Sequence, residues 1–205
     1  MKKVLISIFA TLLAATALFA QTPQEIIAKM DQETARFDKE GFVMVMEMKI
    51  PILGTFSSTL YTIGNKNKSI TNVKGSTLIT WTDGVTERVY DGEKNEITIK
   101  NATPSDAAES ANTLNGITEG YDVKLKKETA DAWYFVCTKS KNNTNKDDPK
   151  KMDLVVSKIT YLPISHSTTV KGVTVTLRDF AIGVNEADLK FDASLYPTAK
   201  IIDKR

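Results

Sequence analysis

The chain has 205 residues, with 27 basic and 25 acidic side chains and a formal net charge of +2. This near-neutral balance, with lysines scattered through predicted turns, gives no electrostatic footprint for nucleic acid or for an anionic membrane. Because Cys137 is the only cysteine, an intramolecular disulfide is excluded. Stability must therefore come from the hydrophobic core, and a chain of this length can bury one of sufficient size.

The N-terminus has the pattern of a bacterial secretory signal peptide. Lys2-Lys3 precedes an apolar stretch, and small residues ending at Ala20 come before a polar segment. No later stretch approaches the ~20 apolar residues that a membrane-spanning helix needs. We therefore expect cleavage of residues 1–20, with Ala15-Thr16-Ala17 as a second candidate site, and a mature single domain of residues 21–205 in the periplasm.

The first predicted element of the mature chain is a helix that runs to about residue 39. Its start, Thr22-Pro23-Gln24-Glu25, has the pattern of a capping box with proline in the first helical position. Its apolar residues, among them Ile26, Met30 and Phe37, form one face. We expect this face to dock on the rest of the protein.

From residue 42 the apolar pattern changes to a period of two, which indicates strands. Short turn signals such as Asp83-Gly84 and Asp91-Gly92 separate them and predict an antiparallel meander. The polar segment 139–150 is expected to be a mobile loop. The predicted strands cover residues 42–50, 56–63, 68–74, 76–81, 85–90, 96–100, 121–127, 133–138, 151–160, 164–171 and 173–182.

A second helix is predicted from Pro104 to Leu114, because Thr103-Pro104-Ser105-Asp106 has a capping pattern and Asn115-Gly116 ends the segment. With one helix before the strands and one inserted among them, the expected class is mainly β with helices (α+β). The expected architecture is an incomplete antiparallel β-barrel or strongly curved sheet, with the helices against its concave side.

Residues with catalytic potential are few. The only histidine, His166, lies in a predicted strand, where a structural role is the more common one. One histidine and one cysteine cannot supply an ordinary zinc shell, and Cys137 shares a strand face with Trp133 and Phe135, as expected for a buried, inert thiol. We therefore expect no enzyme activity and no cofactor. The pair Asp147-Asp148 falls in the polar loop and is expected to be solvated.

Three methionines, Met44, Met46 and Met48, lie on one face of the strand 42–50 together with Phe42. The flexible thioether of methionine suits a surface that repacks around varied apolar ligands, whereas ordinary cores favour leucine, isoleucine and valine. The row is consistent either with a lipid-facing wall or with a core strand that happens to contain methionine. The residues alone favour the core strand slightly.

The C-terminal part of the chain contains the motifs Phe180-Ala181-Ile182, Leu189-Lys190-Phe191-Asp192 and Leu195-Tyr196-Pro197, with Ile201-Ile202-Asp203-Lys204-Arg205 at the end. The middle contains an Asp-Gly turn in Trp81-Thr82-Asp83-Gly84 and a tyrosine-bearing strand at Val89-Tyr90-Asp91. Together these motifs resemble the outer-membrane lipoprotein carrier proteins of the LolA type, which carry acylated proteins. The resemblance implies a LolA-like barrel with a helical lid over an apolar cavity.

For this chain, the resemblance implies that acylated lipoproteins or lipid are bound. It also implies inner-membrane release machinery and an outer-membrane acceptor as partners of a monomer that binds no nucleic acid. The implied lid comprises Pro104, Ala107, Ala108, Ala111 and Leu114, helped by the N-terminal helix. The methionine row would then be cavity wall, and the expected lining residues are Phe42, Met44, Met46, Met48, Leu60, Leu78, Trp81, Ile97 and Phe135.

The chain departs from the family pattern at one point. Carriers of this type have an arginine early in the sheet that holds the lid closed, but no arginine occurs between Phe42 and Gly84. Lys66, Lys68 and Lys74 occupy this region, and an ammonium group lacks the planar fork of donors that arginine offers. Two other hypotheses therefore stay open: a periplasmic lipid-binding or lipoprotein-sensing module on the same fold and, ranked last, a lipid hydrolase that uses His166.

Overall fold

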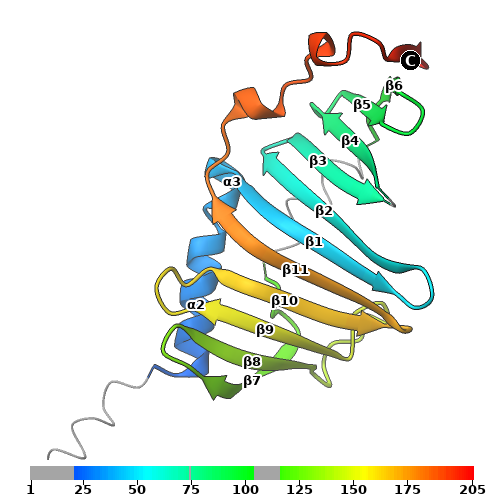
Figure 1. Ribbon diagram of the computed structural model, residues 1–205. Helices are drawn as coiled ribbons and strands as arrows, with labels where there is room; N and C mark the ends of the chain where they lie inside the picture. The colour runs from blue at the N-terminus through cyan, green and yellow to red at the C-terminus, as the bar shows by residue number, and fades with distance from the viewer. Residues whose placement is uncertain (1–20, 74, 104–115) are drawn as a thin grey trace, which may run out of the picture.

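The computed structural model of the chain describes residues 21–73, 75–103 and 116–205. Twelve strands form one curved, unclosed sheet in the order β12-β6-β5-β4-β3-β2-β1-β11-β10-β9-β8-β7 (Figure 1). The strands are β1 (Phe42–Ile50), β2 (Gly54–Ile63), β3 (Lys66–Val73), β4 (Ser76–Thr82), β5 (Thr86–Asp91), β6 (Glu96–Asn101), β7 (Tyr121–Glu128), β8 (Ala132–Lys139), β9 (Lys151–Ser157), β10 (Pro163–Val170), β11 (Val173–Ile182) and β12 (Lys200–Asp203).

The expected class and architecture are confirmed, with one addition at the C-terminus. All pairings are antiparallel except that of β12, which pairs in parallel with β6 and was not predicted as a strand. The last residues therefore return to the edge of the sheet, where they cover the outermost strand of the meander. Two short 3-10 helices, η1 (Glu186–Leu189) and η2 (Ala193–Leu195), lie between β11 and β12.

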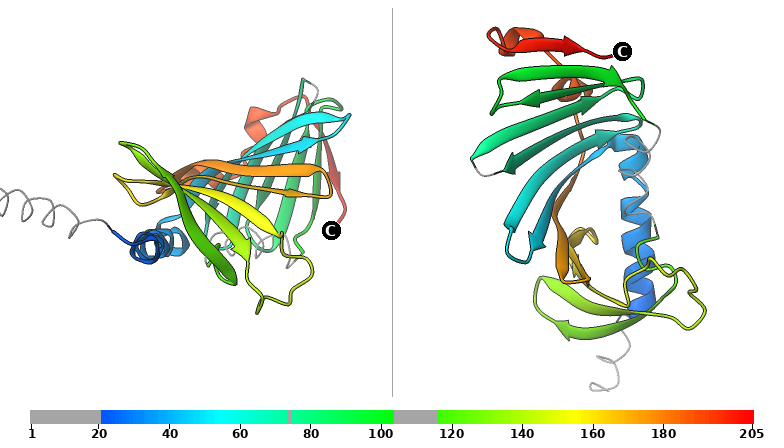
Figure 2. Two further views of the ribbon diagram at one scale, coloured as in Figure 1. Left: turned by 90° about the horizontal axis from the view of Figure 1, so that it is seen from below. Right: turned by 90° about the vertical axis from the view of Figure 1, so that its right-hand side faces the viewer.

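The N-terminal helix is split in two, α2 (Pro23–Thr34) and α3 (Phe37–Glu40). The predicted capping box is present, since Thr22 Oγ1 accepts a hydrogen bond from the Glu25 amide at 3.2 Å and the Glu25 carboxylate accepts one from the Thr22 amide at 2.8 Å. In Figure 1, α2 lies behind the sheet, and Figure 2 shows the sheet bending around it. The face of the sheet that α2 and α3 cover is called the inner face below.

Two clusters of apolar side chains on the inner face form the core. Beneath α2, the residues of the first cluster come from the helix and from β8 and β9: Ile26, Ile27, Met30, Trp133, Phe135, Cys137, Met152, Leu154 and Val156. The second cluster joins α3 to β1 and β11 through Phe37, Phe42, Met44 and Leu177. Ile117 packs against both clusters, so they form one continuous apolar layer.

Candidate functional site

The candidate site is the apolar part of the inner face along β1 and its neighbours β2 and β11. Cross-strand pairs bring Met46 beside Leu177 of β11 and Met44 beside Leu60 of β2. We call this surface the methionine patch. Its members beyond the buried second cluster are only partly buried, and they are Met46, Leu60, Ile117, Leu162, Val175, Phe180 and Ile182.

Burial falls along the methionine row from one end of β1 to the other. Phe42 is 1% exposed and stacks on Phe37 of α3 with 4.8 Å between ring centroids, and Met44 is 4% exposed. Met46 and Met48 are each only half-buried. The patch is therefore covered by α3 at one end and is more exposed toward the β1–β2 turn.

Sequence reasoning missed the contribution of β11. Alternation along Val173–Ile182 would have placed Val175 and Leu177 on one face, but Phe180 then falls out of step. The structure resolves this with a register shift opposite β1, where Asp179 adopts a positive φ of 58°. Such a bulge moves the side chains that follow onto the other face. As a result, Phe180 joins Leu177 in the methionine patch.

Two of the predicted lining residues lie on the opposite, outer face. Trp81 pairs with Lys68 and Arg88, whereas the inner face at this height carries Thr80 and Thr82. Ile97 pairs with Tyr90 on the same outer face. The structure therefore does not bring Trp81 and Ile97 together with the methionine row.

The other predicted lining residues lie on the inner face but differ in their surroundings. Phe135 is 1% exposed and belongs to the closed core beneath α2. Leu60 packs against the methionine patch, and Leu78 of β4 is 38% exposed further along the same face. The predicted lid residues Pro104, Ala107, Ala108, Ala111 and Leu114 lie outside the described residues.

The inner face changes character from β2 toward β6, where hydroxyl and charged groups replace apolar ones. Thr71 donates a hydrogen bond to Ser58 Oγ at 2.9 Å, and Lys100 pairs with the buried Glu87 at 3.0 Å. The buried polar residues on this part of the face are Ser58, Thr62, Asn67, Thr82 and Glu87. The inner face thus has an apolar half and a polar half that meet at β2.

The lysines expected to replace the family's lid-closing arginine have a different role where they are described. Lys66 pairs with Glu186 of η1 at 2.7 Å, and Lys68 donates to the backbone oxygen of Asp188 at 3.4 Å. Both therefore hold the C-terminal segment on the outer face. Lys74 lies outside the described residues.

Four of the motifs that carry the family resemblance meet on this outer face, whereas Phe180-Ala181-Ile182 contributes to the methionine patch. The ring of Trp81 contacts those of Phe191 and Tyr196 at centroid distances of 5.2 and 5.8 Å, and Tyr196 also lies 4.4 Å from Tyr90. The aromatic residues of the middle and C-terminal motifs thus form one cluster that anchors the last residues of the chain. These rings stabilise the fold and lie on the opposite face of the sheet from the methionine patch.

His166 lies on the inner face beside the methionine patch. It pairs with Leu177, and its Nε2 is 3.2 Å from Sδ of Met152. Both residues line an open depression of about 710 Å³, which Ile117, Tyr121 and polar residues of the loop 139–150 also line. Because Ile117 also packs against the methionine patch, the depression adjoins that patch.

Chemical groups for catalysis do not converge in the part of the chain that is described. Burial lowers the pKa of His166 and raises the pKa of the Cys137 thiol to about 11, so the imidazole is neutral and the thiol protonated at neutral pH. Among the described residues, no group of three or more histidine, cysteine, aspartate or glutamate side chains could hold a metal ion.

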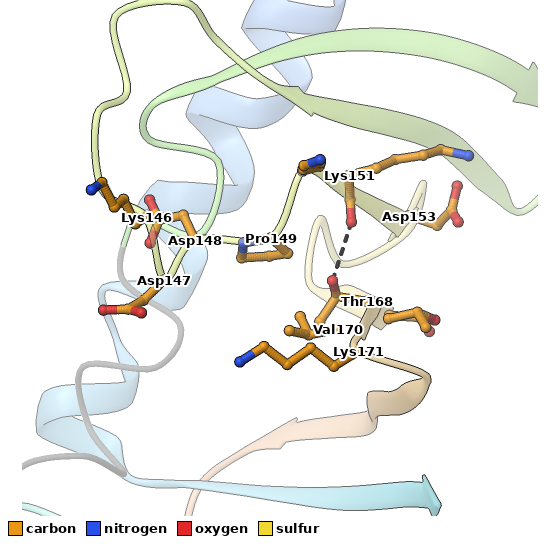
Figure 3. Close-up of a pocket in the computed structure, with 12 residues that line it drawn as sticks. Lys146, Asp147, Asp148, Pro149, Lys151, Asp153, Thr168, Val170 and Lys171 are labelled. Atoms are coloured by element: carbon orange, nitrogen blue, oxygen red, sulfur yellow. Dashed lines mark hydrogen bonds between the residues drawn. The ribbon is translucent and has the colours of Figure 1, made fainter. Parts of the chain in front are cut away.

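The loop 139–150, expected to be mobile, is held by its own side chains. The Asp148 carboxylate accepts hydrogen bonds from Asn143 and Asn145, each at 2.7 Å. Together with the end of β10, this loop lines a hollow of about 640 Å³ that contains Lys146, Lys151 and Lys171 (Figure 3).

In residues 21–73, 75–103 and 116–205, no helix combines the length and the apolar character needed to cross a membrane. Comparison with family models gives no match, and neither does comparison with curated proteins.

Solved structures do match. An uncharacterized conserved protein from Thermus thermophilus is 14% identical, with 90% of this chain and 100% of that chain covered and a TM-score of 0.46. A LolA superfamily protein from Nitrosomonas europaea is 15% identical over 84% of this chain and 99% of that one, with a TM-score of 0.34. The MucA/MucB complex of Pseudomonas aeruginosa gives 12% identity, coverage of 82% and 60%, and a TM-score of 0.40. Likenesses of this extent do not establish a family or a function for the chain.

Proposed function

We propose that the protein is a periplasmic carrier that shields the acyl chains of lipoproteins on the methionine patch and delivers them toward the outer membrane. The observation that supports this most directly is the incomplete burial of the patch. Met46, Met48 and Val175 remain half-buried beside a well-packed core. A contiguous patch of partly exposed apolar side chains offers a surface on which an apolar ligand can bind.

The division of the inner face favours an amphiphilic ligand over a purely apolar one. Acyl chains would lie on the methionine patch, and the polar group that carries them would reach the hydroxyl-rich half. Ser58 is the inner-face partner of both Met46 and Thr71, so apolar and hydroxyl groups adjoin within one strand spacing. An acylated protein has this chemistry, with chains joined to a polar linkage and a peptide.

Energetics explain why such a ligand needs an escort. At ~0.8 kcal/mol per CH₂, exposing one chain of about sixteen carbons to water costs on the order of 12 kcal/mol. A carrier must also release its cargo, which requires a wall that adapts without gripping tightly. Methionine side chains meet this requirement because they are flexible and polarizable.

A second candidate is a periplasmic lipid-binding or lipoprotein-sensing module on the same fold. It would use the same patch but retain its ligand and change the state of a protein partner. The polar half of the inner face suits the ligands of both candidates equally well. The two candidates differ in the ligand that co-purifies with the protein and in what happens after the ligand binds.

Native mass spectrometry of the mature protein, purified from a Gram-negative periplasm, separates the two candidates. Bound acylated protein would support the carrier and identify its cargo, whereas free lipid alone would favour the binding module. Protein recovered without either, under conditions that preserve the complexes of a known carrier, would contradict both. The same spectrum tests the proposed cleavage, since a mature chain beginning at Gln21 has a defined mass.

A further inference from the structure

Large apolar side chains project into solvent from the turn between β1 and β2. Ile52 is fully exposed and Leu53 is 62% exposed. The neighbouring β10–β11 turn adds Val170, which is 43% exposed. The two turns adjoin, because a Cβ on Gly172 would lie 3.7 Å from Cγ of Pro51. We call this surface, formed by residues 50–54 and 170–173, the apolar tip, and both turns lie at the right-hand ends of their strands in Figure 1.

The backbone holds Ile52 outward at an energetic cost. Ile52 has a positive φ of 71°, and the amide of Leu53 donates to the carbonyl of Pro51 at 2.8 Å. A hydrogen bond between residues two apart around a positive φ makes a γ-turn of the rare, strained form. A β-branched residue with positive φ is an outlier for which glycine would be the ordinary choice. Strain of this kind is concentrated at functional sites.

Lysines lie on one side of the apolar tip. Lys49 and Lys171 lie in or beside the two turns, and the hollow that adjoins Val170 contains further lysines and aspartates (Figure 3). Counting Lys49, this surface carries Lys49, Lys146, Lys150, Lys151 and Lys171 against Asp147, Asp148 and Asp153. This surface therefore carries two more lysines than aspartates. Lys49 is about a hundred residues from the others in the sequence, so only the fold brings it beside Lys171.

We propose that the apolar tip docks the protein on the surface of an anionic lipid bilayer. Side chains on a protruding turn can enter the acyl boundary of a bilayer, and lysines beside them can reach lipid phosphates while their stems stay in apolar surroundings. A protein partner would instead require a pocket that accepts two separate protruding turns.

The apolar tip lies at the end of β1 where the methionine patch is most exposed. The patch becomes more exposed from Met44 toward Met48, which is the direction of the tip. A docked tip would therefore bring the open end of the patch to the bilayer. The proposal deepens the carrier role and partly rests on it, but bilayer docking and acyl binding involve different residues and fail independently.

Vesicle co-sedimentation of the mature protein tests the proposal. The probes are vesicles of phosphatidylethanolamine and phosphatidylglycerol, and vesicles of phosphatidylcholine alone. We expect binding to the anionic vesicles that weakens as salt is raised, and weaker binding to the neutral ones. The double substitution Ile52→Ser with Leu53→Ser should reduce the vesicle affinity about tenfold or more. Both side chains are exposed, so the thermal midpoint should not fall.

Ile159 provides a matched control, because it is 82% exposed in the turn between β9 and β10, at the opposite ends of the strands. Ile159→Ser should leave vesicle affinity within about twofold of the wild type. Lys49→Glu with Lys171→Glu should abolish the preference for anionic vesicles. The proposal is overturned if neither vesicle binds, or if the Ile159 variant loses as much affinity as the Ile52/Leu53 variant. A fluorescent fatty-acid titration of each variant keeps this result separate from acyl binding.

Discussion

His166 illustrates how one side chain on the inner face connects stability to pH. Its ring lies beside Met152, and burial lowers its pKa below the ordinary value. The imidazole is therefore held neutral in the folded protein, next to a thioether that is a poor partner for a charged ring. Protonation of His166 opposes folding.

The free energy of unfolding should therefore fall as pH decreases. Well above the unfolded pKa of about 6.5, His166 is neutral in both states and contributes no pH dependence. Below this value the unfolded chain binds the proton first, so stability falls with pH until the folded pKa is reached, by at most ~1.4 kcal/mol per unit. Urea unfolding between about pH 5.5 and 7.5 measures this slope. In His166→Gln the slope should disappear, and an unchanged slope in that variant would contradict the assignment.

At the scale of elements, the C-terminal segment is attached to the sheet by aromatic rings and by β12. Tyr196 touches Trp81 and Tyr90 on the outer face, and the amide of Lys200 donates to the carbonyl of Asn95 at 3.0 Å where the pairing with β6 begins. The four residues of β12 are mostly exposed, so the ring cluster supplies much of the apolar contact that holds this segment.

Tyr196→Ala should lower the free energy of unfolding by ~1–3 kcal/mol, because the ring contacts are lost together with its buried area. Hydrogen exchange should show faster exchange in β12 and β6 than in β1. Leu195→Ala is the matched control, since Leu195 is 71% exposed and its truncation should cost less than ~0.5 kcal/mol. Equal destabilisation by the two substitutions would show that the ring cluster does not anchor the segment.

At the scale of the whole molecule, local pattern predicted the meander but not all of the site. Alternation and turn residues located β1 to β11, and the capping box located the start of α2. β12 escaped prediction because four residues give little pattern and its partner β6 lies about a hundred residues earlier. Long-range pairing of this kind leaves no local signal.

The errors in the predicted wall have two different causes. Leu78 and Trp81 lie three positions apart in one strand, so alternation alone puts them on opposite faces and both could not line one wall. The place of Phe180 in the methionine patch could not be read from the sequence, because it depends on the bulge at Asp179. The pairing of Leu78 with Trp81 in one wall could therefore have been rejected from the sequence, whereas the position of Phe180 could only be learned from the structure.

The measurement that tests the central claim most directly is the affinity of the mature protein for a fluorescent fatty-acid analogue, compared between two adjacent substitutions in β1. Met46 faces the methionine patch and Val45 faces outward beside Arg178. Both side chains are half-buried. The two substitutions therefore introduce a carboxylate at similar exposure, one on each face of the same strand. Thermal melts of the two variants provide the folding control.

We predict that Met46→Asp folds but binds the probe about tenfold or more weakly, because a charge on the wall must be desolvated when an acyl chain covers it. Val45→Asp should bind within about twofold of the wild type. Equal loss in both variants, or a Met46→Asp protein that fails to fold while Val45→Asp folds, would contradict the account and make the methionine row an ordinary core strand.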